Sequence, residues 1–397
     1  MSSISLYVHI PFCRAKCAYC DFNSYAGLEH LFGDYVQALV HEIELVGQAL
    51  NLEARTVYIG GGTPTVLSLD QLVSIMVACR RSFLPVNDIE ITIEANPGTV
   101  DGDYLAGLLD LGINRLSLGV QSFNDQELCL LGRIHTAAEA IESYRLARKV
   151  GFTNINLDLI YGIPYQTLDH WREALRQALD LGPNHLSLYA LTLEEHTPLA
   201  QRVACGEVPA PDDDLAADMY ILVEEMLAEE GYVHYEISNW ARLKAESWKL
   251  ETSIRHPAFS FQYPVCRHNL TYWHNEPYLG FGAGAHSYFD GRRYYNVLHP
   301  AGYIERLSKG KSPVAESEEI SRDLEMAETM ILGLRLVEEG VRFSDFEGRF
   351  GRELHEVYGK EVEELRELGL IEVDDERVRL TARGRLLGNE VFERFLP

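Results

Sequence analysis

Positive charge is scarce in this chain, and long hydrophobic runs are absent. Its 397 residues include 35 Lys and Arg against 60 Asp and Glu, which gives a formal net charge of −25 at pH 7. An acidic surface repels phosphate groups, so this balance argues against nucleic-acid binding. No apolar run approaches the about 20 residues of a membrane-spanning helix. The first residues, Met1 to His9, also lack the basic and apolar regions of a secretory signal, and we expect a cytoplasmic protein with no transmembrane segment.

Cysteine is scarce too, with seven residues in the whole chain. In the cytosol such cysteines are usually free thiols, metal ligands or catalytic groups, and seldom disulfides. Three of them, Cys13, Cys17 and Cys20, nevertheless stand together with the spacing C-x3-C-x2-C. This short segment is therefore the first candidate site of the sequence.

Three thiolates on one loop can hold three irons of a [4Fe–4S] cube. Clusters that only transfer electrons usually have four cysteine ligands, whereas three ligands leave one iron open to a small molecule. Two other interpretations stay open: a structural zinc ion, which needs a fourth ligand such as His9, and a redox thiol pair, which needs only two cysteines. For a cluster, we expect Phe12, Tyr19 and Phe22 to shield the thiols from water.

Apolar, β-rich runs alternate with helical stretches over the first half of the chain. The predicted strands are Leu6–His9, Thr56–Gly60, Ile89–Glu94, Arg115–Val120, Asn154–Leu159 and His185–Ala190. Stretches of helical periodicity follow them, as in Tyr35–Leu50, Ala137–Val150 and Leu168–Leu181. Such repeats predict parallel βαβ units and hence an α/β fold, a partial (β/α)6 barrel short of the eight strands of a closed one. An open doubly wound sheet is the competing fold.

The pattern changes in the second half of the chain. The segment Leu243–Val265 is irregular and is predicted to be an inserted loop. From about Ile320, three helical stretches and two short strands predict a small α+β domain of the winged-helix type. Residues 321–397 carry 12 basic and 19 acidic side chains, which argues against DNA binding by that domain. We therefore predict three parts: a core over 1–240, an insertion and loop segment over 241–320, and the C-terminal domain over 321–397.

Polar or glycine-rich residues follow nearly every predicted strand, at the end where α/β barrels carry their chemistry. Glu94 can accept from an ammonium group, and Arg133 can pair with a carboxylate. Gln121 and Asp158 can bond ribose hydroxyls, and the glycine run 60–62 lets a ligand approach the backbone. Each signal alone is weak, because a glycine-rich turn is often only a turn and a lone acidic residue often a cap. Together they fit S-adenosylmethionine, an amino acid joined to a nucleoside.

Several of these segments resemble the radical SAM superfamily. Within it, they are similar to the branch of the oxygen-independent coproporphyrinogen III oxidases and the HemW-type heme chaperones. The resemblance covers most of the chain and is most specific at the cysteine loop. The matching segments are Tyr7–Cys13, Gly60–Thr65, Glu94–Pro97, Gly119–Phe123, Asp158–Pro164, His268–Trp273 and Gly280–Ser287, together with the C-terminal domain.

The resemblance implies a set of cofactor contacts. The [4Fe–4S] ligands would be Cys13, Cys17 and Cys20, with an electron donor to reduce the cluster. The S-adenosylmethionine contacts would be Tyr7, Tyr19, Gly61, Gly62, Thr63, Glu94, Gln121, Arg133 and Asp158.

Two departures from the oxidase pattern favour the chaperones. The oxidases carry a further cysteine at the position of Phe22, and they have a longer segment before the cluster than the twelve residues before Cys13. The chaperones carry an HNxxYW motif, which stands here at His268–Trp273. The resemblance therefore implies a heme chaperone that passes heme to an unidentified acceptor protein. The alternatives are the oxidase activity and a zinc-stabilised scaffold, and whether the chain is an enzyme stays open.

The HNxxYW motif allows two interpretations. By the resemblance, the heme contacts would be His268, Asn269, Tyr272 and Trp273. A neutral histidine can ligate heme iron, and aromatic rings can stack on the macrocycle. The alternative is structural: His268 and Asn269 cap a turn, while the two aromatic residues fill the core. Further candidate iron ligands are Cys266, His274, His286 and His299.

Overall fold

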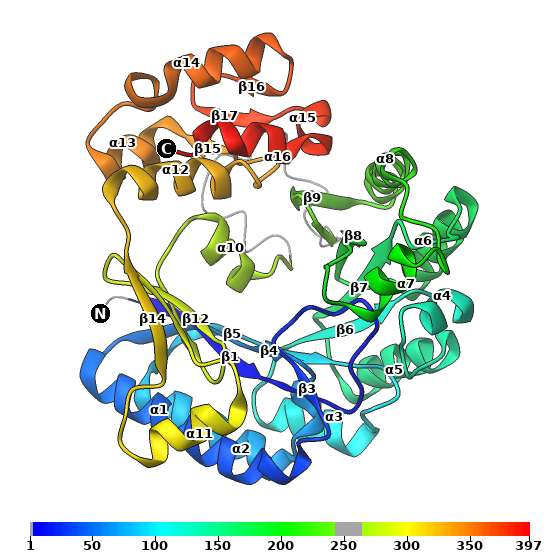
Figure 1. The fold of residues 1–397 in the computed structure, drawn as a ribbon, viewed down its shortest axis with the longest axis vertical. Coiled ribbons are helices and arrows are strands. Elements are labelled where there is room, and N and C mark those ends of the chain that lie inside the picture. The colour runs from blue at the N-terminus through cyan, green and yellow to red at the C-terminus, as the bar shows by residue number, and fades with distance from the viewer. Residues whose placement is uncertain (1–2, 243–263) are drawn as a thin grey trace. The chain divides into compact units, whose positions relative to one another are not determined.

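The computed structural model describes residues 3–242 and 264–397 (Figure 1). Contacts divide the chain into two compact units. The first comprises Met1–Met226, Tyr278–Phe289 and Arg293–Ser317, and the second comprises Leu227–Pro277, Asp290–Arg292 and Glu318–Pro397. The boundaries expected at residues 240 and 320 stay a prediction. None of the helices in the described residues combines the length and the apolar composition that a membrane span requires.

The first unit is built on parallel strands that follow one another in chain order. Their order in the sheet is β1-β4-β5-β6-β7-β8, and each neighbouring pair is parallel. The bounds are β1 Ser3–Ile10, β4 Glu53–Gly61, β5 Leu84–Ala95, β6 Arg115–Gln121, β7 Ile155–Tyr161 and β8 His185–Ala190. The partial barrel is thus confirmed. The doubly wound alternative is wrong, because that fold reverses its strand order at a switch point.

Helices follow these strands and lie outside the curved sheet in Figure 1. They are α1 Phe32–Leu50, α2 Leu69–Ser82, α3 Gly102–Asp110, α4 Asp125–Leu130, α5 Ala137–Val150, α6 Leu168–Leu181, α7 Pro198–Ala204 and α8 Asp213–Glu229. The capping chemistry explains their bounds. α5 begins after a capping box between Thr136 and Glu139 and ends at Gly151 in the left-handed region. The predicted ranges of α5 and α6 are therefore confirmed to the residue.

A late segment extends this sheet beyond β1. Its elements are β11 Tyr278–Phe281, β12 His286–Phe289, β13 Arg292–Asn296, α11 Pro300–Ser308 and β14 Val314–Glu319. β11 pairs with β1 in parallel, and the order continues outward as β12, β13 and β14. These strands were not predicted, although Asp290-Gly291, with both residues at positive φ, is a strong hairpin signal between β12 and β13.

A buried carboxylate fastens this late segment to α1. Glu42 accepts hydrogen bonds from the Gly282 amide (2.9 Å), the Asn296 side chain (2.7 Å) and the Tyr303 hydroxyl (2.5 Å). Burial raises the pKa of Glu42 to about 7, although these three bonds act in the opposite direction. The Tyr35 hydroxyl accepts from the Ala283 amide and donates to the backbone carbonyl of His9. The end of β1 is therefore held in place from residues far along the chain.

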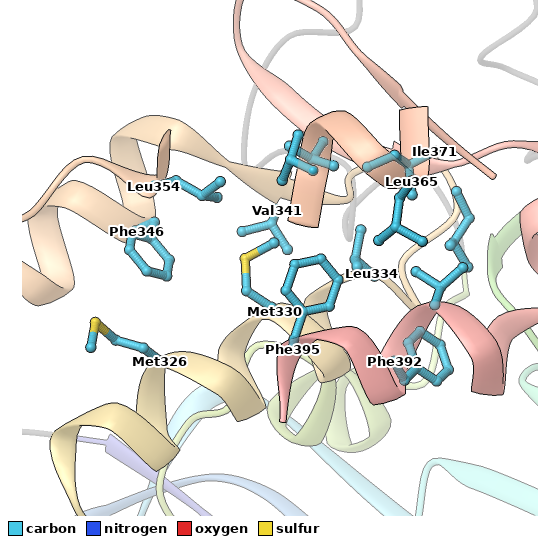
Figure 2. Packing of buried hydrophobic residues seen from close by; sticks show 14 of the residues in the cluster. Met326, Met330, Leu334, Val341, Phe346, Leu354, Leu365, Ile371, Phe392 and Phe395 are labelled. Atoms are coloured by element: carbon cyan, nitrogen blue, oxygen red, sulfur yellow. The ribbon is translucent and has the colours of Figure 1, made fainter. Parts of the chain in front are cut away.

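The second unit has its own core, formed by the C-terminal residues (Figure 2). Its elements are α12 Arg322–Gly333, β15 Val341–Arg342, α13 Phe343–Phe350, α14 Leu354–Glu367, β16 Ile371–Val373, β17 Arg377–Leu380, α15 Ala382–Leu386 and α16 Gly388–Phe392. Met330, Leu334, Phe346, Leu365 and Phe395 are among the buried residues of this core. The predicted helices and two-stranded wing are confirmed. β15, which pairs with β17, and the last two helices were not predicted.

Three shorter elements of the second unit precede α12 in the described residues. β9 (Tyr232–Glu236) and β10 (Asn239–Arg242) form an antiparallel pair, and α10 spans Arg267–Trp273. The predicted loop Leu243–Val265 lies outside the described residues, apart from its last two. α10 contains the HNxxYW motif, so all four predicted heme contacts lie on this helix.

Candidate functional site

The cysteine segment forms a closed loop directly after β1. β2 (Phe12–Cys13) pairs with β3 (Tyr25–Ala26) and brings the two ends of the loop together. All three cysteines are free and half-buried. Phe12 is buried and Tyr19 half-buried, but Phe22 is 70% exposed. The expectation that Phe22 shields the thiols is wrong, because the chain bends there, with the Ser24 amide donating to the Phe22 carbonyl oxygen (2.6 Å).

Each thiol of the loop has a polar side chain within contact distance. The contacts are Thr63 Oγ1 to Cys13 Sγ (3.6 Å), Arg133 Nη1 to Cys17 Sγ (3.4 Å) and Ser24 Oγ to Cys20 Sγ (3.9 Å). Burial raises the pKa of the Cys13 and Cys20 thiols. Donors directed at sulfur favour the thiolate, which is the form that ligates iron.

The donor set fits a three-thiolate cluster better than a single zinc ion. A cube takes one thiolate on each of three irons, whereas a structural zinc ion needs a fourth protein ligand besides the three cysteines. Both ring nitrogens of His9 are occupied, Nδ1 by the Tyr7 hydroxyl (2.9 Å) and Nε2 by the carbonyl oxygen of Asn23 (2.9 Å). His9 is therefore not free to be a fourth ligand.

The glycine run after β4 passes directly against β1 and the cysteine loop. A Cβ on Gly61 would lie 2.5 Å from the His9 ring, and Gly61 also has a φ of +117°. A Cβ on Gly62 would lie 2.6 Å from the carbonyl oxygen of Phe12 and 3.0 Å from Cys13 Sγ. Only glycine permits this approach, because no real side chain tolerates such contacts.

Glu94 lies on β5 and faces the same region. Its carboxylate accepts from the Tyr58 hydroxyl (2.7 Å) and from the Gly61 amide (3.0 Å). Desolvation raises its pKa to about 7, and the charge of Asp158 adds to this rise. Tyr58 was not predicted as a site residue. The available signal was its position two residues before Gly60 on β4, which places both on one face of the strand.

Arg133 joins several strand ends in one hydrogen-bond network. Its Nη2 donates to Asn96 Oδ1 (2.6 Å) and to the carbonyl oxygen of Gly119 (2.6 Å), while its buried Nε has no partner among the described residues. Asn96 in turn donates to Thr63 Oγ1 (2.9 Å). Cys17, Thr63, Asn96 and Arg133 also line a small cavity of about 10 Å³. The orphaned donor leaves Arg133 able to take a further acceptor.

The remaining adenosyl candidates of the first unit lie on neighbouring strands and on the cysteine loop. Asp158 on β7 accepts from Ser117 Oγ (3.1 Å) and Asn156 Nδ2 (2.7 Å), and burial raises its pKa. Gln121 ends β6 at a φ of +67°. Burial also raises the pKa of Tyr19, whose hydroxyl feels the charges of Arg133 and Asp158. The expected side chains of this unit thus gather on adjacent parallel strands and their ends, the cysteine loop and, for Arg133, the connection between α4 and α5.

The HNxxYW motif forms α10 in the second unit. Cys266 is the N-cap of this helix, and no side chain makes a capping bond there. The structural alternative, in which His268 and Asn269 cap a turn, is therefore wrong in this respect, because both lie within the helix. His268 is buried, and its Nε2 lies 2.9 Å from the Tyr272 hydroxyl. The Trp273 ring lies 4.5 Å from Arg335 Cζ.

The further candidate iron ligands have different environments. Cys266 is fully buried, and His274 Nε2 lies 3.3 Å from Glu339 in the same unit. His286 and His299 belong to the first unit. His299 caps α11, since its Nδ1 accepts from the Ala301 amide (3.2 Å).

Comparisons with known proteins agree with this geometry. Residues 7–178 match the Radical SAM superfamily, and residues 320–387 match the HemN C-terminal domain. The heme chaperone HemW of Bacillus subtilis is 38% identical over 394 residues, covering 99% of each chain. The heme chaperone HemW of Escherichia coli is 39% identical over 309 residues, covering 76% of each chain.

Among solved structures, the coproporphyrinogen III oxidase HemN of Escherichia coli, a radical SAM enzyme, superimposes with a TM-score of 0.83 at 25% identity. The match covers 99% of this chain and 90% of that one. The cysteine loop, the parallel strand order and the C-terminal domain thus agree with full-length sequence similarity, and the chain belongs to the radical SAM superfamily, in the family of the HemW heme chaperones.

Proposed function

We propose that this chain is a heme chaperone that binds a [4Fe–4S] cluster, S-adenosylmethionine and heme, and transfers heme to an acceptor protein. The observation that carries the proposal is the 38% identity to a HemW heme chaperone over 99% of both chains. This similarity includes both the cysteine loop and the helix with the HNxxYW motif.

Cys13, Cys17 and Cys20 would hold the cluster. When bound, the cluster supplies one-electron chemistry, for which a separate electron donor is needed. Thr63 and Arg133 stand 3.6 and 3.4 Å from the sulfurs of Cys13 and Cys17, where they would hydrogen-bond the ligands of the cluster. Iron and sulfide analysis of anaerobically purified protein should find about four of each per chain, whereas stoichiometric zinc would support the scaffold alternative.

S-adenosylmethionine would bind polar groups of the first unit. Glu94 would accept from its ammonium group, and Arg133 would donate its orphaned Nε–H to the carboxylate. Gln121 and Asp158 would bond the ribose hydroxyls. The contacts would be completed by Tyr7, Tyr19, Gly61, Gly62 and Thr63.

Heme would bind at α10 through His268, Asn269, Tyr272 and Trp273. For heme iron to bind at Nε2 of His268, the Tyr272 hydroxyl must leave that nitrogen, which it contacts at 2.9 Å. The buried imidazole is thus already oriented by a partner that heme would displace.

The test of the proposal is a heme-transfer assay. Purified protein is loaded with heme and mixed with an apo b-type hemoprotein, and transfer is followed by the Soret band. We expect transfer from the unaltered chain, and we expect His268→Ala to weaken heme binding by about tenfold or more. His355→Ala, which removes an exposed histidine of the second unit, is the matched control and should bind heme normally. Absence of a stable Soret shift in the unaltered chain would overturn the proposal.

Coproporphyrinogen III oxidation is the second candidate function, favoured by the TM-score of 0.83 to that oxidase. Anaerobic incubation with coproporphyrinogen III, S-adenosylmethionine and a reductant decides between the two. We expect no vinyl product, because Phe22 occupies the position at which the oxidases carry a further cysteine. Formation of protoporphyrinogen IX would favour the oxidase instead.

A further inference from the structure

Two buried hydrogen-bond donors of the second unit have no acceptor within residues 3–242 and 264–397. They are Nε1 of Trp273, at the end of α10, and Nε of Arg335, just after α12. Neither atom has a hydrogen-bond partner among the residues that the structure describes. Buried donors are normally paired, so two neighbouring exceptions call for an explanation.

The two donors belong to side chains that stack on each other. Arg335 Cζ lies 4.5 Å from the centroid of the Trp273 ring and 6.0 Å from that of Phe392. The backbone also holds Arg335, because its carbonyl oxygen accepts from the Ile237 amide (3.1 Å). Both side chains remain partly exposed, but the two donor atoms themselves are buried, so neighbouring atoms must shift for a ligand to reach them. The guanidinium group is thus pre-positioned, with its Nε–H unused.

The neighbouring carboxyl group does not satisfy Arg335. Glu236 is fully buried, and its Oε1 accepts from the side chain of Asn239. Its Oε2 has no hydrogen-bond partner in the described part of the chain. Burial raises the pKa of Glu236, although the Asn239 bond and the charge of Arg335 act against this rise. Arg335 therefore faces a carboxyl group that is harder to ionise than usual.

We propose that Trp273 and Arg335 form a carboxylate-binding site, and that its ligand is a propionate group of heme. The inference rests on the proposed heme-chaperone function. A carboxylate has acceptor sites for both donors, and Arg binds it strongly through its planar fork. The propionates are the anionic groups of the heme periphery. Asn269, another proposed heme contact, is four residues before Trp273 and therefore lies on the same face of α10, which lets one heme contact both.

The test compares heme with heme dimethyl ester, in which both propionates are neutral. Each is titrated into the full-length chain and followed by the Soret band. We expect the unaltered chain to bind heme about tenfold or more tightly than the ester. Arg335→Met, which keeps the apolar stem, should remove most of this preference by weakening heme binding and leaving ester binding unchanged.

Two further variants protect the test against misfolding and against a general charge effect. Trp273→Phe keeps an aromatic ring but loses the N–H, and it should reduce the preference for heme by severalfold. Arg366→Met removes an exposed arginine of the same unit, which pairs with Glu363, and it should retain the full preference. Circular dichroism and thermal unfolding establish that each variant is folded.

The outcomes separate this inference from the function on which it rests. If the unaltered chain binds neither compound, the proposed function and this inference both fail. If heme binds and His268→Ala weakens it, but the preference survives in Arg335→Met and Trp273→Phe, only the carboxylate site is overturned. The carboxylate site is also overturned if the unaltered chain binds heme and its ester equally. In that case a buried water or an Arg335–Glu236 contact would satisfy the two unpaired donors.

Discussion

Replacing Glu94 with Gln tests the adenosyl site at its most informative position. The carboxylate accepts from Tyr58 and from the Gly61 amide, and it is proposed to accept from the ligand's ammonium group. The substitution keeps the shape of the side chain and removes its negative charge. A hydrogen bond to a charged group contributes about 1.5–3 kcal/mol. We therefore expect S-adenosylmethionine to bind roughly 10- to 150-fold more weakly to Glu94→Gln.

The same carboxyl group predicts a pH dependence with a definite sign. Desolvation raises the pKa of Glu94 to about 7, so the group becomes neutral as the pH falls below that value. Affinity for the cationic amine should therefore decrease as the pH is lowered through about 7. The Tyr58 hydrogen bond holds this pKa down, so Tyr58→Phe should move the decrease to higher pH. Glu94→Gln should show no such decrease.

Anaerobic calorimetry of S-adenosylmethionine binding to cluster-loaded protein measures both effects. The titrations should be carried out between about pH 6 and 7.5, because α-amino groups lose their proton near pH 7.7–8.0 and the amine of the ligand must stay charged. Tyr58→Phe is the matched control, since it alters the environment of Glu94 and leaves the carboxylate in place. Equal affinity of Glu94→Gln and the unaltered chain at pH 7.5, or a flat pH profile in the unaltered chain, would refute the assigned role of Glu94.

Three further predictions follow from close contacts. Gly62→Ala should reduce the iron content of reconstituted protein, because the added Cβ would lie 3.0 Å from Cys13 Sγ and overpacking costs about 1–3 kcal/mol. An unchanged iron content would contradict this prediction. Thr63→Val should lower the midpoint potential of the cluster by roughly 40 mV in EPR titrations. This shift corresponds to the loss of one hydrogen bond to sulfur of about 1 kcal/mol. An unshifted potential would show that the Thr63 hydroxyl does not act on the cluster. Arg349→Met should lower the unfolding free energy of the second unit by about 1–3 kcal/mol in denaturant unfolding. The reason is that Arg349 pairs with Glu325 at 2.7 Å and donates to two backbone carbonyl oxygens just after α10. A change below about 0.5 kcal/mol, which is typical of surface substitutions, would contradict this prediction.

The elements that could be predicted from the sequence depend on neighbours along the chain. Helix α5 was predicted to the residue because Thr136 and Glu139 form its capping box and Gly151 ends it. The three cysteines lie within eight residues of one another, so their spacing alone indicates a common loop. The parallel strands repeat a local pattern of strand and helix, and their order follows from that repetition.

Only the tertiary structure shows the contacts between residues that lie far apart in the sequence. β11 joins the sheet beside β1 although more than 260 residues separate them, and Glu42 finds all three partners beyond residue 280. The Tyr58–Glu94 bond and the Trp273–Arg335 stack likewise join separate elements. Periodicity and capping describe a segment and its immediate flanks, whereas such pairs depend on how whole elements pack. The chemistry of the cysteine loop could therefore be predicted from the sequence. The residues that position the loop and alter the properties of its thiols could not.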